Sequence, residues 1–179
     1  MGEEKILLEK TLLKRISDLF GAIPEQFLLV NIAQQTLSVV TTDAVQTSYS
    51  ISTSKYGSGN EEGSFKTPVG IHRIAEKIGE GSPAGRIFKD RIDTGITWSS
   101  EMPDEDNLIL SRILRLEGLE PGINRGPHID SYERFIYIHG TNKEALIGTP
   151  ISHGCICMKN NDIIKLFDRI PEKTIVIIT

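Results

Sequence analysis

The chain has few cysteines, no long apolar run and no excess of basic charge. Its 179 residues include only Cys155 and Cys157, which are separated by one residue. A disulfide across that spacing would close a small strained ring and constrain almost no chain, so reduced thiols in a reducing compartment are expected. The formal charge of −4 argues against nucleic-acid binding, which depends on a basic surface. The longest apolar stretches, such as 27–32 and 175–178, are too short to cross a bilayer, so no membrane contact is expected.

The N-terminal residues lack the features of an export signal. Such a signal needs a positively charged start, an apolar block of about 7–15 residues and a cleavage site of small residues. Glu3 and Glu4 come first instead, and charges interrupt the apolar pairs that follow. Taken from Met1, the sequence predicts a cytoplasmic protein. A trimmed sequence would leave a periplasmic location open.

The composition is that of an ordinary globular protein, with 39% hydrophobic and 25% charged residues. Its length predicts one domain with a sizeable core. Apolar residues recur at helical spacing near the N-terminus, and Gly21 offers a C-terminal stop, so an amphipathic helix is predicted over 4–20. We therefore divide the chain into an N-terminal helical segment, 1–25, and a single larger domain, 26–179. The sequence does not indicate an oligomeric state.

Runs rich in Val, Ile, Leu and Thr predict a mainly β fold. The first three runs, 26–33, 36–42 and 45–54, are joined by short polar connections and predict an antiparallel meander. Further strands are expected at 69–78, 86–88, 96–98, 109–116, 134–139 and 174–178. By composition, 55–67 and most of 79–107 are loops. A short helix is expected over 142–147, and another from Asn160 or Asn161 to the residue before Pro171. The pattern predicts a β-sandwich or open barrel with two or three helices and long loops over one end.

The segment 138–158 carries the residues that predict chemistry. A thiol nucleophile needs a base, donors for the developing oxyanion, and a backbone that lets the substrate approach. Cys155 follows Gly154, which has no Cβ, and the N–H groups of both residues are expected to point at the oxyanion. His139 ends a predicted strand upstream and is the candidate base. A nearby imidazole lowers the pKa of a thiol, so we expect an activated Cys155.

Other interpretations of these residues remain open. Cys157 has the character of a small buried hydrophobic residue. His139, His153, Cys155 and Cys157 could supply four zinc ligands, but the C-x-C spacing is shorter than zinc sites usually use. No metal or other cofactor is therefore expected. His153 either fixes the turn or takes part in the chemistry, and the residues favour neither role.

The HG and SHGC blocks at 139–140 and 152–155 resemble the signature of the L,D-transpeptidase catalytic domain, the YkuD-type fold. Residues 65–70, FKTPVG, resemble that family's TP-x-G element. Residues 134–140 resemble the strand that delivers its first motif histidine. The resemblance covers about residues 26–179, which is nearly all of the chain beyond the first predicted helix.

The resemblance implies Cys155 as the acylated nucleophile and His139 as its base. Three residues of the second motif would shape the oxyanion pocket: Ser152, His153 and Gly154. It also implies a sandwich-like β fold, no metal, and peptidoglycan stem peptides as the substrate.

The implied reaction begins with attack on the L,D bond between the third and fourth stem residues, which releases D-alanine and leaves a thioester. Hydrolysis of the thioester makes the enzyme an L,D-carboxypeptidase, and transfer to an amine makes it an L,D-transpeptidase. The missing export signal favours the carboxypeptidase, which would trim soluble tetrapeptides in cell-wall recycling. A module that binds stem peptides without turnover, and a papain-like protease, are the alternatives from other classes.

One departure from the family pattern concerns the residue two positions after the nucleophile. Many members have arginine there, and this chain has Cys157. Four arginines are candidates to replace it: Arg73, Arg112, Arg125 and Arg134. We prefer Arg125, because loops carry substrate contacts more often than strand interiors. Tyr137 and Gly140 are the other predicted substrate contacts.

Overall fold

The computed structural model describes residues 10–41, 44–103 and 106–179. Its described strands are β1 (Gln26–Asn31), β2 (Thr36–Thr41), β3 (Val45–Ser52), β4 (Gly70–Ile78), β5 (Arg86–Lys89), β6 (Ile92–Thr97), β7 (Ile109–Gly118), β8 (Tyr137–Gly140), β9 (Ile156–Met158) and β10 (Ile175–Ile178). The described helices are α1 (Lys10–Phe20), α2 (Asn160–Arg169) and the short 3-10 helix η1 (Glu144–Leu146).

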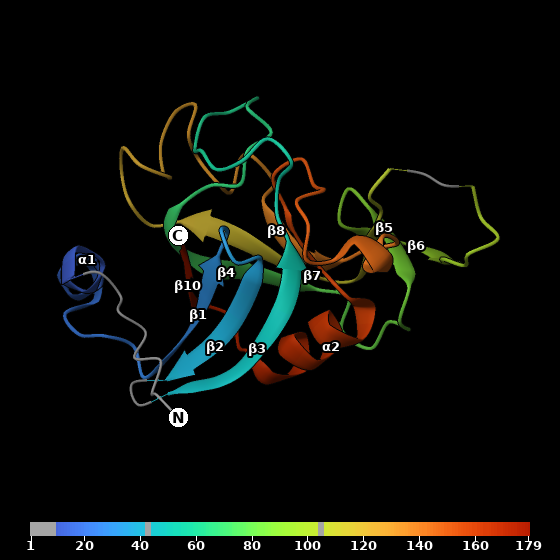
Figure 1. Cartoon of the computed structure of the whole chain (residues 1–179), viewed down its shortest axis with the longest axis horizontal. Coiled ribbons are helices and arrows are strands. Elements are labelled where there is room, and N and C mark those ends of the chain that lie inside the picture. The colour runs from blue at the N-terminus through green and yellow to red at the C-terminus, as the bar shows by residue number, and fades with distance from the viewer. Residues whose placement is uncertain (1–9, 42–43, 104–105) are drawn as a thin grey trace.

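The strands form one sheet in the order β4-β10-β1-β2-β3-β9-β8-β7-β5-β6 (Figure 1). Because β4 also pairs with β7, the sheet closes on itself as a barrel, and the β5–β6 hairpin extends from its rim. The mainly β prediction is confirmed, and so is the antiparallel meander β1–β2–β3. The final strand, β10, lies between β1 and β4, parallel to β1 and antiparallel to β4. Each strand of a closed barrel has a hydrogen-bonding partner on both of its edges.

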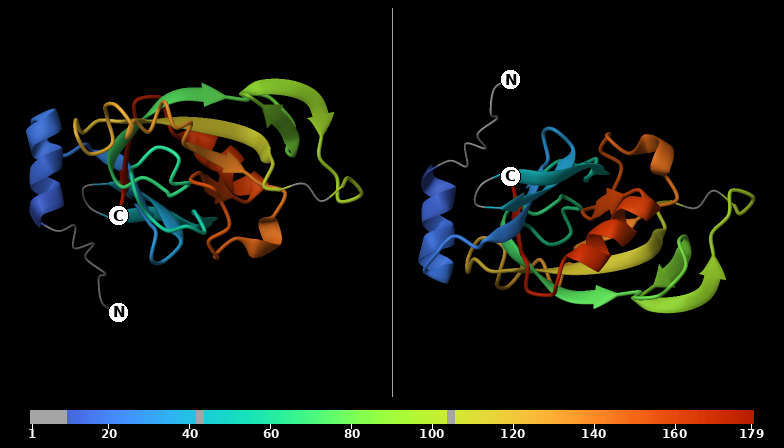
Figure 2. Two further views of the ribbon diagram at one scale, coloured as in Figure 1. Left: turned by 90° about the horizontal axis from the view of Figure 1, so that it is seen from above. Right: turned by 90° about the horizontal axis from the view of Figure 1, so that it is seen from below.

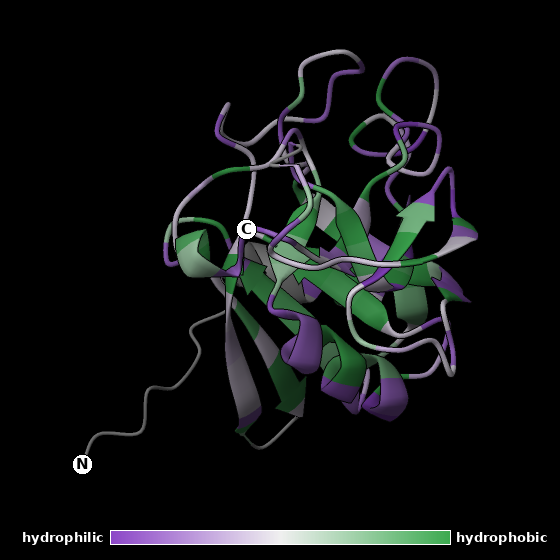
Figure 3. Cartoon of the chain, turned by 90° about the vertical axis from the view of Figure 1, so that its right-hand side faces the viewer, coloured by the Kyte–Doolittle hydropathy of each residue, from purple (hydrophilic) through white to green (hydrophobic). Residues whose placement is uncertain are grey.

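Alternating side chains of the barrel strands point inward and form the main core. In β2, for example, Leu37 and Val39 are fully buried, while Thr36 before them and Ser38 between them are only partly buried. The apolar side of α2 covers the same core with Ile163 and other residues. Hydrophobic residues accordingly concentrate on the strands and hydrophilic ones on the loops (Figure 3).

Helix α1 packs beside the barrel on the side opposite the β5–β6 hairpin (Figure 2). Ile16 is fully buried in a cluster that includes Phe27 and Ile71, and Arg15 forms an ion pair with Glu120. The predicted part of this helix before Lys10 lies outside the described residues. Within the described part of the chain, neither α1 nor α2 has the length and apolar character needed to cross a membrane.

Several predicted elements differ from the structure, among them the strand expected at 96–98, which is β6 and begins earlier, at Ile92. The strand expected from Arg134 begins at Tyr137, because Phe135 has a φ of +55°, which an extended strand cannot accommodate. Strand β9 was not expected, since three residues are too short for a visible period-two pattern. The helix expected over 142–147 is the single 3-10 turn η1.

Two loops meet over one end of the barrel: residues 53–69, between β3 and β4, and residues 119–136, between β7 and β8. The Glu62 N–H donates to the carbonyl of His128 over 2.7 Å, and Arg134 donates to the carbonyl of Gly59 over 3.2 Å. Both loops rise on the same side of the sheet (Figure 1). This loop layer borders the segment that carries Cys155.

Candidate active site

His139 lies in β8, between β7 and β9, and is 1% exposed. Its Nδ1 is 2.7 Å from the carbonyl oxygen of Gly140. A carbonyl oxygen only accepts hydrogen bonds, so Nδ1 carries the proton and Nε2 of the neutral ring keeps its lone pair. Gly140 is required there, because a Cβ would lie 2.7 Å from the carbonyl oxygen of Leu110 and would also clash with Asn160.

The turn before the candidate nucleophile is held by Ser152. Its hydroxyl donates to the carbonyl of Cys155 over 2.5 Å and accepts the N–H of Gly154 over 3.2 Å. Gly154 has a φ of +126°, a conformation that favours glycine. We expected the Gly154 N–H to point at an oxyanion; in the structure it donates to the Ser152 hydroxyl, and its role toward an oxyanion stays a prediction.

Thr67 ties this turn to the barrel. Its hydroxyl donates to the carbonyl of Gly154 over 3.0 Å and accepts the N–H of Ser54 over 3.0 Å. Thr67 is fully buried, so neither bond is shared with solvent. Thr67 lies in the FKTPVG segment that the sequence analysis singled out, but the sequence gave no reason to expect its hydrogen bond to Gly154.

Cys155 is half-buried and lines a small open pocket of about 180 Å³. The other residues that line this pocket are Asp106, Asn107, Ile109, His139 and His153. The structure therefore brings the predicted nucleophile and both motif histidines to one cavity. The Cys155 thiol donates to the carbonyl of Phe135 over 3.6 Å.

Burial sets the protonation state of the two central groups. It raises the pKa of the Cys155 thiol to about 11, although a backbone hydrogen bond at Tyr137 and the charge of Arg134 lower it. Burial also lowers the pKa of His139 to about 4, against the hydrogen bond to Gly140. The expected lowering of the thiol pKa was wrong, because desolvation outweighs the neighbouring groups. The pair is a neutral thiol and a neutral imidazole near pH 7.

Cys157 is fully buried on the next strand, β9. Its Sγ lies 3.9 Å from Nε2 of His139 and accepts a hydrogen bond from the Asn107 amide over 3.1 Å. Asn107 is in turn held by the hydroxyl of Thr141 over 2.7 Å. Burial raises the pKa of Cys157 to about 12. Cys157 thus packs beside the histidine ring, with less access to solvent than Cys155.

Arg134 is the candidate arginine whose charge acts on Cys155. It donates to the carbonyl of Lys66 over 2.6 Å and to that of Gly59, so it also joins the two loops above the site. Two other candidates are engaged elsewhere: Arg73 pairs with Glu117, and Arg112 donates to the carbonyl of Ser82.

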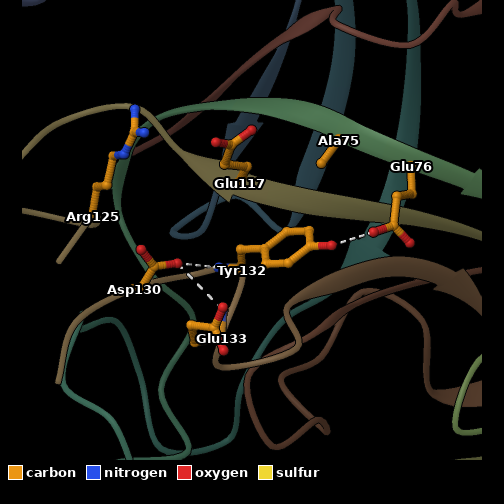
Figure 4. Close-up of a pocket in the computed structure, with 7 residues that line it drawn as sticks. All are labelled: Ala75, Glu76, Glu117, Arg125, Asp130, Tyr132 and Glu133. Atoms are coloured by element: carbon orange, nitrogen blue, oxygen red, sulfur yellow. Dashed lines mark hydrogen bonds between the residues drawn. The ribbon is translucent and has the colours of Figure 1, made fainter. Parts of the chain in front are cut away.

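Arg125 lines a different pocket, of about 370 Å³, which shares no lining residue with the pocket of Cys155. The other residues there are Ala75, Glu76, Glu117, Asp130, Tyr132 and Glu133 (Figure 4). The Tyr132 hydroxyl donates to Glu76 at the end of the pocket away from Arg125. The structure does not bring Arg125 to Cys155, and its contact with substrate stays a prediction.

Tyr137 is buried beside Cys155 in an apolar cluster with Phe88 and Ile113. Its hydroxyl accepts a hydrogen bond from Arg91 over 3.1 Å. Its role toward substrate also stays a prediction. In residues 10–41, 44–103 and 106–179, no three His, Cys, Asp or Glu side chains are grouped so that they could hold a metal ion.

The sequence matches the family of YkuD-type L,D-transpeptidase catalytic domains over residues 25–178. The names of two curated relatives assign them provisionally to the L,D-transpeptidases. YqjB of Bacillus subtilis is 48% identical over 46 residues, which cover 26% of each chain. YbiS of Escherichia coli is 30% identical over 110 residues, which cover 60% of this chain and 35% of YbiS. The matched regions thus span about a third or less of these relatives.

Solved structures of L,D-transpeptidases have a similar fold. One from Mycobacterium smegmatis matches 87% of this chain and 58% of its own with a TM-score of 0.54 and 16% identity. L,D-transpeptidase 3 of Mycobacterium tuberculosis, in complex with a faropenem-derived adduct, matches 87% of this chain and 60% of its own with a TM-score of 0.55 and 16% identity.

Proposed function

The chain belongs to the family of L,D-transpeptidase catalytic domains, and we propose that it uses Cys155 to cleave peptidoglycan stem tetrapeptides and release D-alanine. The observation that carries this proposal is the pocket that Cys155 and His139 share. The half-buried thiol is the more accessible of the two cysteines, and His139, which lines the same pocket, keeps a free lone pair on Nε2.

In the first step, the sulfur of Cys155 attacks the carbonyl carbon of the third stem residue. The thiol proton passes to Nε2 of His139 and then to the amine of the departing D-alanine as the C–N bond breaks. A thioester remains on Cys155. We assign the Cys155 N–H to the oxyanion, joined by the Gly154 N–H once it leaves Ser152.

In the second step, His139 takes a proton from the attacking water, the C–S bond breaks, and the proton passes from His139 to the departing sulfur of Cys155, which restores the thiol as the tripeptide leaves. The pocket of Cys155, of about 180 Å³, is open to solvent, so water has access to the thioester. This access supports water as the acceptor.

The experiment incubates the purified protein with a disaccharide tetrapeptide, with and without excess acceptor peptide, and identifies the products by mass. The proposal predicts tripeptide and free D-alanine, with little cross-linked dimer. Dimer that forms faster than tripeptide would make the protein a transpeptidase instead. Binding without either product, unchanged in Cys155→Ala, would favour a module that only captures stem peptides.

A cytoplasmic location is a further part of this proposal, in which the substrate is a soluble tetrapeptide. Detection of the protein in membrane-free cell extract, and not in the periplasmic fraction, is the expected result. Recovery with the periplasm would move the reaction to the cell wall and favour cross-linking.

A further inference from the structure

The β5–β6 hairpin places a cation against the segment that contacts the candidate nucleophile. The two residues of its turn, Asp90 and Arg91, have φ values of +50° and +67°, both positive as in a type I′ turn. Arginine is uncommon in this conformation, which glycine and asparagine adopt more easily. The guanidinium carbon of Arg91 lies 5.1 Å from the centroid of the Phe135 ring, and its Nη1 donates to the Tyr137 hydroxyl over 3.1 Å.

Phe135 is itself strained and is held from two sides. Its φ of +55° lies in the left-handed region, which is uncommon for a bulky residue. The guanidinium of the buried Arg115 lies 5.2 Å from the centroid of the same ring, so two cations are placed against it, an arrangement that attracts. Because the ring is 48% exposed, these contacts hold the residue more than burial does. Strain that the surrounding contacts maintain is typical of functional sites.

The carbonyl of Phe135 accepts the thiol of Cys155 over 3.6 Å. Two residues along the chain, Tyr137 forms a backbone hydrogen bond that lowers the pKa of the same thiol. The two backbone groups act in opposite directions, because an acceptor stabilises the protonated sulfur and a donor stabilises the thiolate. The thiol proton is thus directed at Phe135, and the sulfur must turn before it can hand that proton to His139.

We propose that Phe135 is a positioning residue, whose carbonyl keeps Cys155 protonated until the sulfur turns towards His139. Arg91 and Arg115 hold the ring, and the ring in turn fixes the carbonyl. This inference rests on the proposed function, which makes Cys155 the nucleophile. When the sulfur turns, the bond to Phe135 breaks and the thiol proton passes to Nε2 of His139. The β5–β6 hairpin therefore takes part in the resting state of the site through Arg91.

The test changes the grip on the Phe135 ring and leaves the other groups around the sulfur in place. The titratable and charged groups that face Cys155 from the neighbouring elements are Asp106, Arg134, His139, His153 and Cys157. None of them is altered. Arg91 does not line the pocket of Cys155, so its replacement also leaves the wall of that pocket unchanged.

Two pairs of variants and one control are compared with the wild type. Arg91→Asn suits the left-handed turn but removes the cation, whereas Arg91→Lys keeps a cation for the ring. Phe135→Leu removes the ring, whereas Phe135→Tyr keeps one. Lys89→Gln is the matched control, because it removes an exposed cation from the same hairpin. The rate of iodoacetamide labelling of Cys155 is measured between pH 7 and pH 10 by peptide mapping, and D-alanine release from a tetrapeptide is measured in parallel.

Arg91→Asn and Phe135→Leu are expected to be labelled roughly 2–10-fold faster than the wild type at each pH, the range that one hydrogen bond supplies. Arg91→Lys, Phe135→Tyr and Lys89→Gln should keep the wild-type rate. The direction is decisive, because loss of a nearby cation alone disfavours the thiolate and would slow the labelling. A gain in access alone would speed Phe135→Leu but not Arg91→Asn.

Labelling that is unchanged or slower in either Arg91→Asn or Phe135→Leu would overturn the positioning role, and so would an equal rise in Lys89→Gln. These outcomes leave the proposed function untouched as long as the wild type releases D-alanine. Wild-type protein that releases no D-alanine and forms no dimer would overturn the proposed function, whatever the labelling rates of the variants.

Discussion

His139 donates its Nδ1–H to the carbonyl oxygen of Gly140, its own neighbour in the chain, over 2.7 Å. A backbone carbonyl has no proton to lose or gain, so this bond orients the ring at every pH at which the protein is folded. It also fixes the tautomer that leaves Nε2 free to accept a proton. No carboxylate is needed to hold the ring, and the orienting group is supplied by the strand that carries the histidine.

Replacement of His139 should remove the base without removing the fold. His139→Gln keeps an amide that can donate to Gly140 but cannot accept a proton in catalysis. We expect kcat for D-alanine release to fall by roughly 10²–10⁴, the usual contribution of a positioned acid–base group, while peptide affinity changes little. Turnover within a few-fold of wild type would mean that another group, with His153 the first candidate, takes the proton.

The neutral state of the pair predicts how the thiol responds to pH. Because burial raises the pKa of Cys155 to about 11 and lowers that of His139 to about 4, little thiolate is present at pH 7. The rate of alkylation by iodoacetamide should rise about tenfold per pH unit between pH 7 and 10, since only the thiolate reacts. Peptide mapping should locate the label on Cys155 before Cys157. A rate that levels off below pH 8 would instead indicate a thiolate–imidazolium pair.

Thr67 should be needed for the geometry of the nucleophile turn. Thr67→Val removes the hydroxyl that bonds Gly154 and Ser54 and leaves two buried groups unsatisfied, which costs roughly 1–3 kcal/mol each. The shift of the turn should lower kcat by about 10–10², because small misplacements of reacting groups are expensive. Thr67→Ser keeps both bonds and should restore most of the rate. Equal rates in the valine and serine variants would contradict this role.

Two buried histidines should make the protein sensitive to acid. Burial lowers the pKa of His72 and of His139 to about 4, from 6.5 in the unfolded chain. The unfolded state therefore binds more protons as pH falls from about 6.5 to about 4, and the free energy of unfolding decreases over that window. Each histidine accounts for roughly 3 kcal/mol at the lower end.

Urea unfolding at pH 7.5 and pH 4.5 measures this effect. His72→Gln should show a smaller loss of stability between the two pH values than the wild type, whatever its stability at pH 7.5. The comparison isolates one histidine from the carboxyl groups that also titrate in acid. An equal decrease in the free energy of unfolding in both proteins would show that His72 does not contribute to the acid sensitivity as predicted.

Several strands of the barrel were predictable because their side chains face the core and the solvent in alternation. Strand β2 follows that pattern, whereas β7 is buried along nearly its whole length and was recognised by its apolar composition. The predicted limits of both strands differ from the structure by a few residues at most. The alternation does not report backbone strain, so the break at Phe135 was not visible. It also does not report closure, which depends on the pairing of β4 with β7, strands distant in sequence.

The motif residues of the site were predictable, and the contacts among them were not. The sequence placed Cys155 and His139 in one site, but it suggested an activated thiol because it contains no information on desolvation. The roles of Thr67 and Asn107 depend on hydrogen bonds between segments far apart in the chain. The effect of Arg134 on the pKa of Cys155 could not be predicted either, because it depends on how two loops fold and not on a local sequence pattern.

The most direct test of the account is the location of the acyl group. The full chain is mixed with tetrapeptide, quenched in acid within one turnover, digested at low pH and analysed by fragment-ion mass spectrometry, because Cys155 and Cys157 fall in the same short peptide. The account predicts a tripeptidyl thioester on Cys155, which persists in Cys157→Ser and is absent from Cys155→Ala. An adduct on Cys157, or continued release of D-alanine by Cys155→Ala, would contradict it.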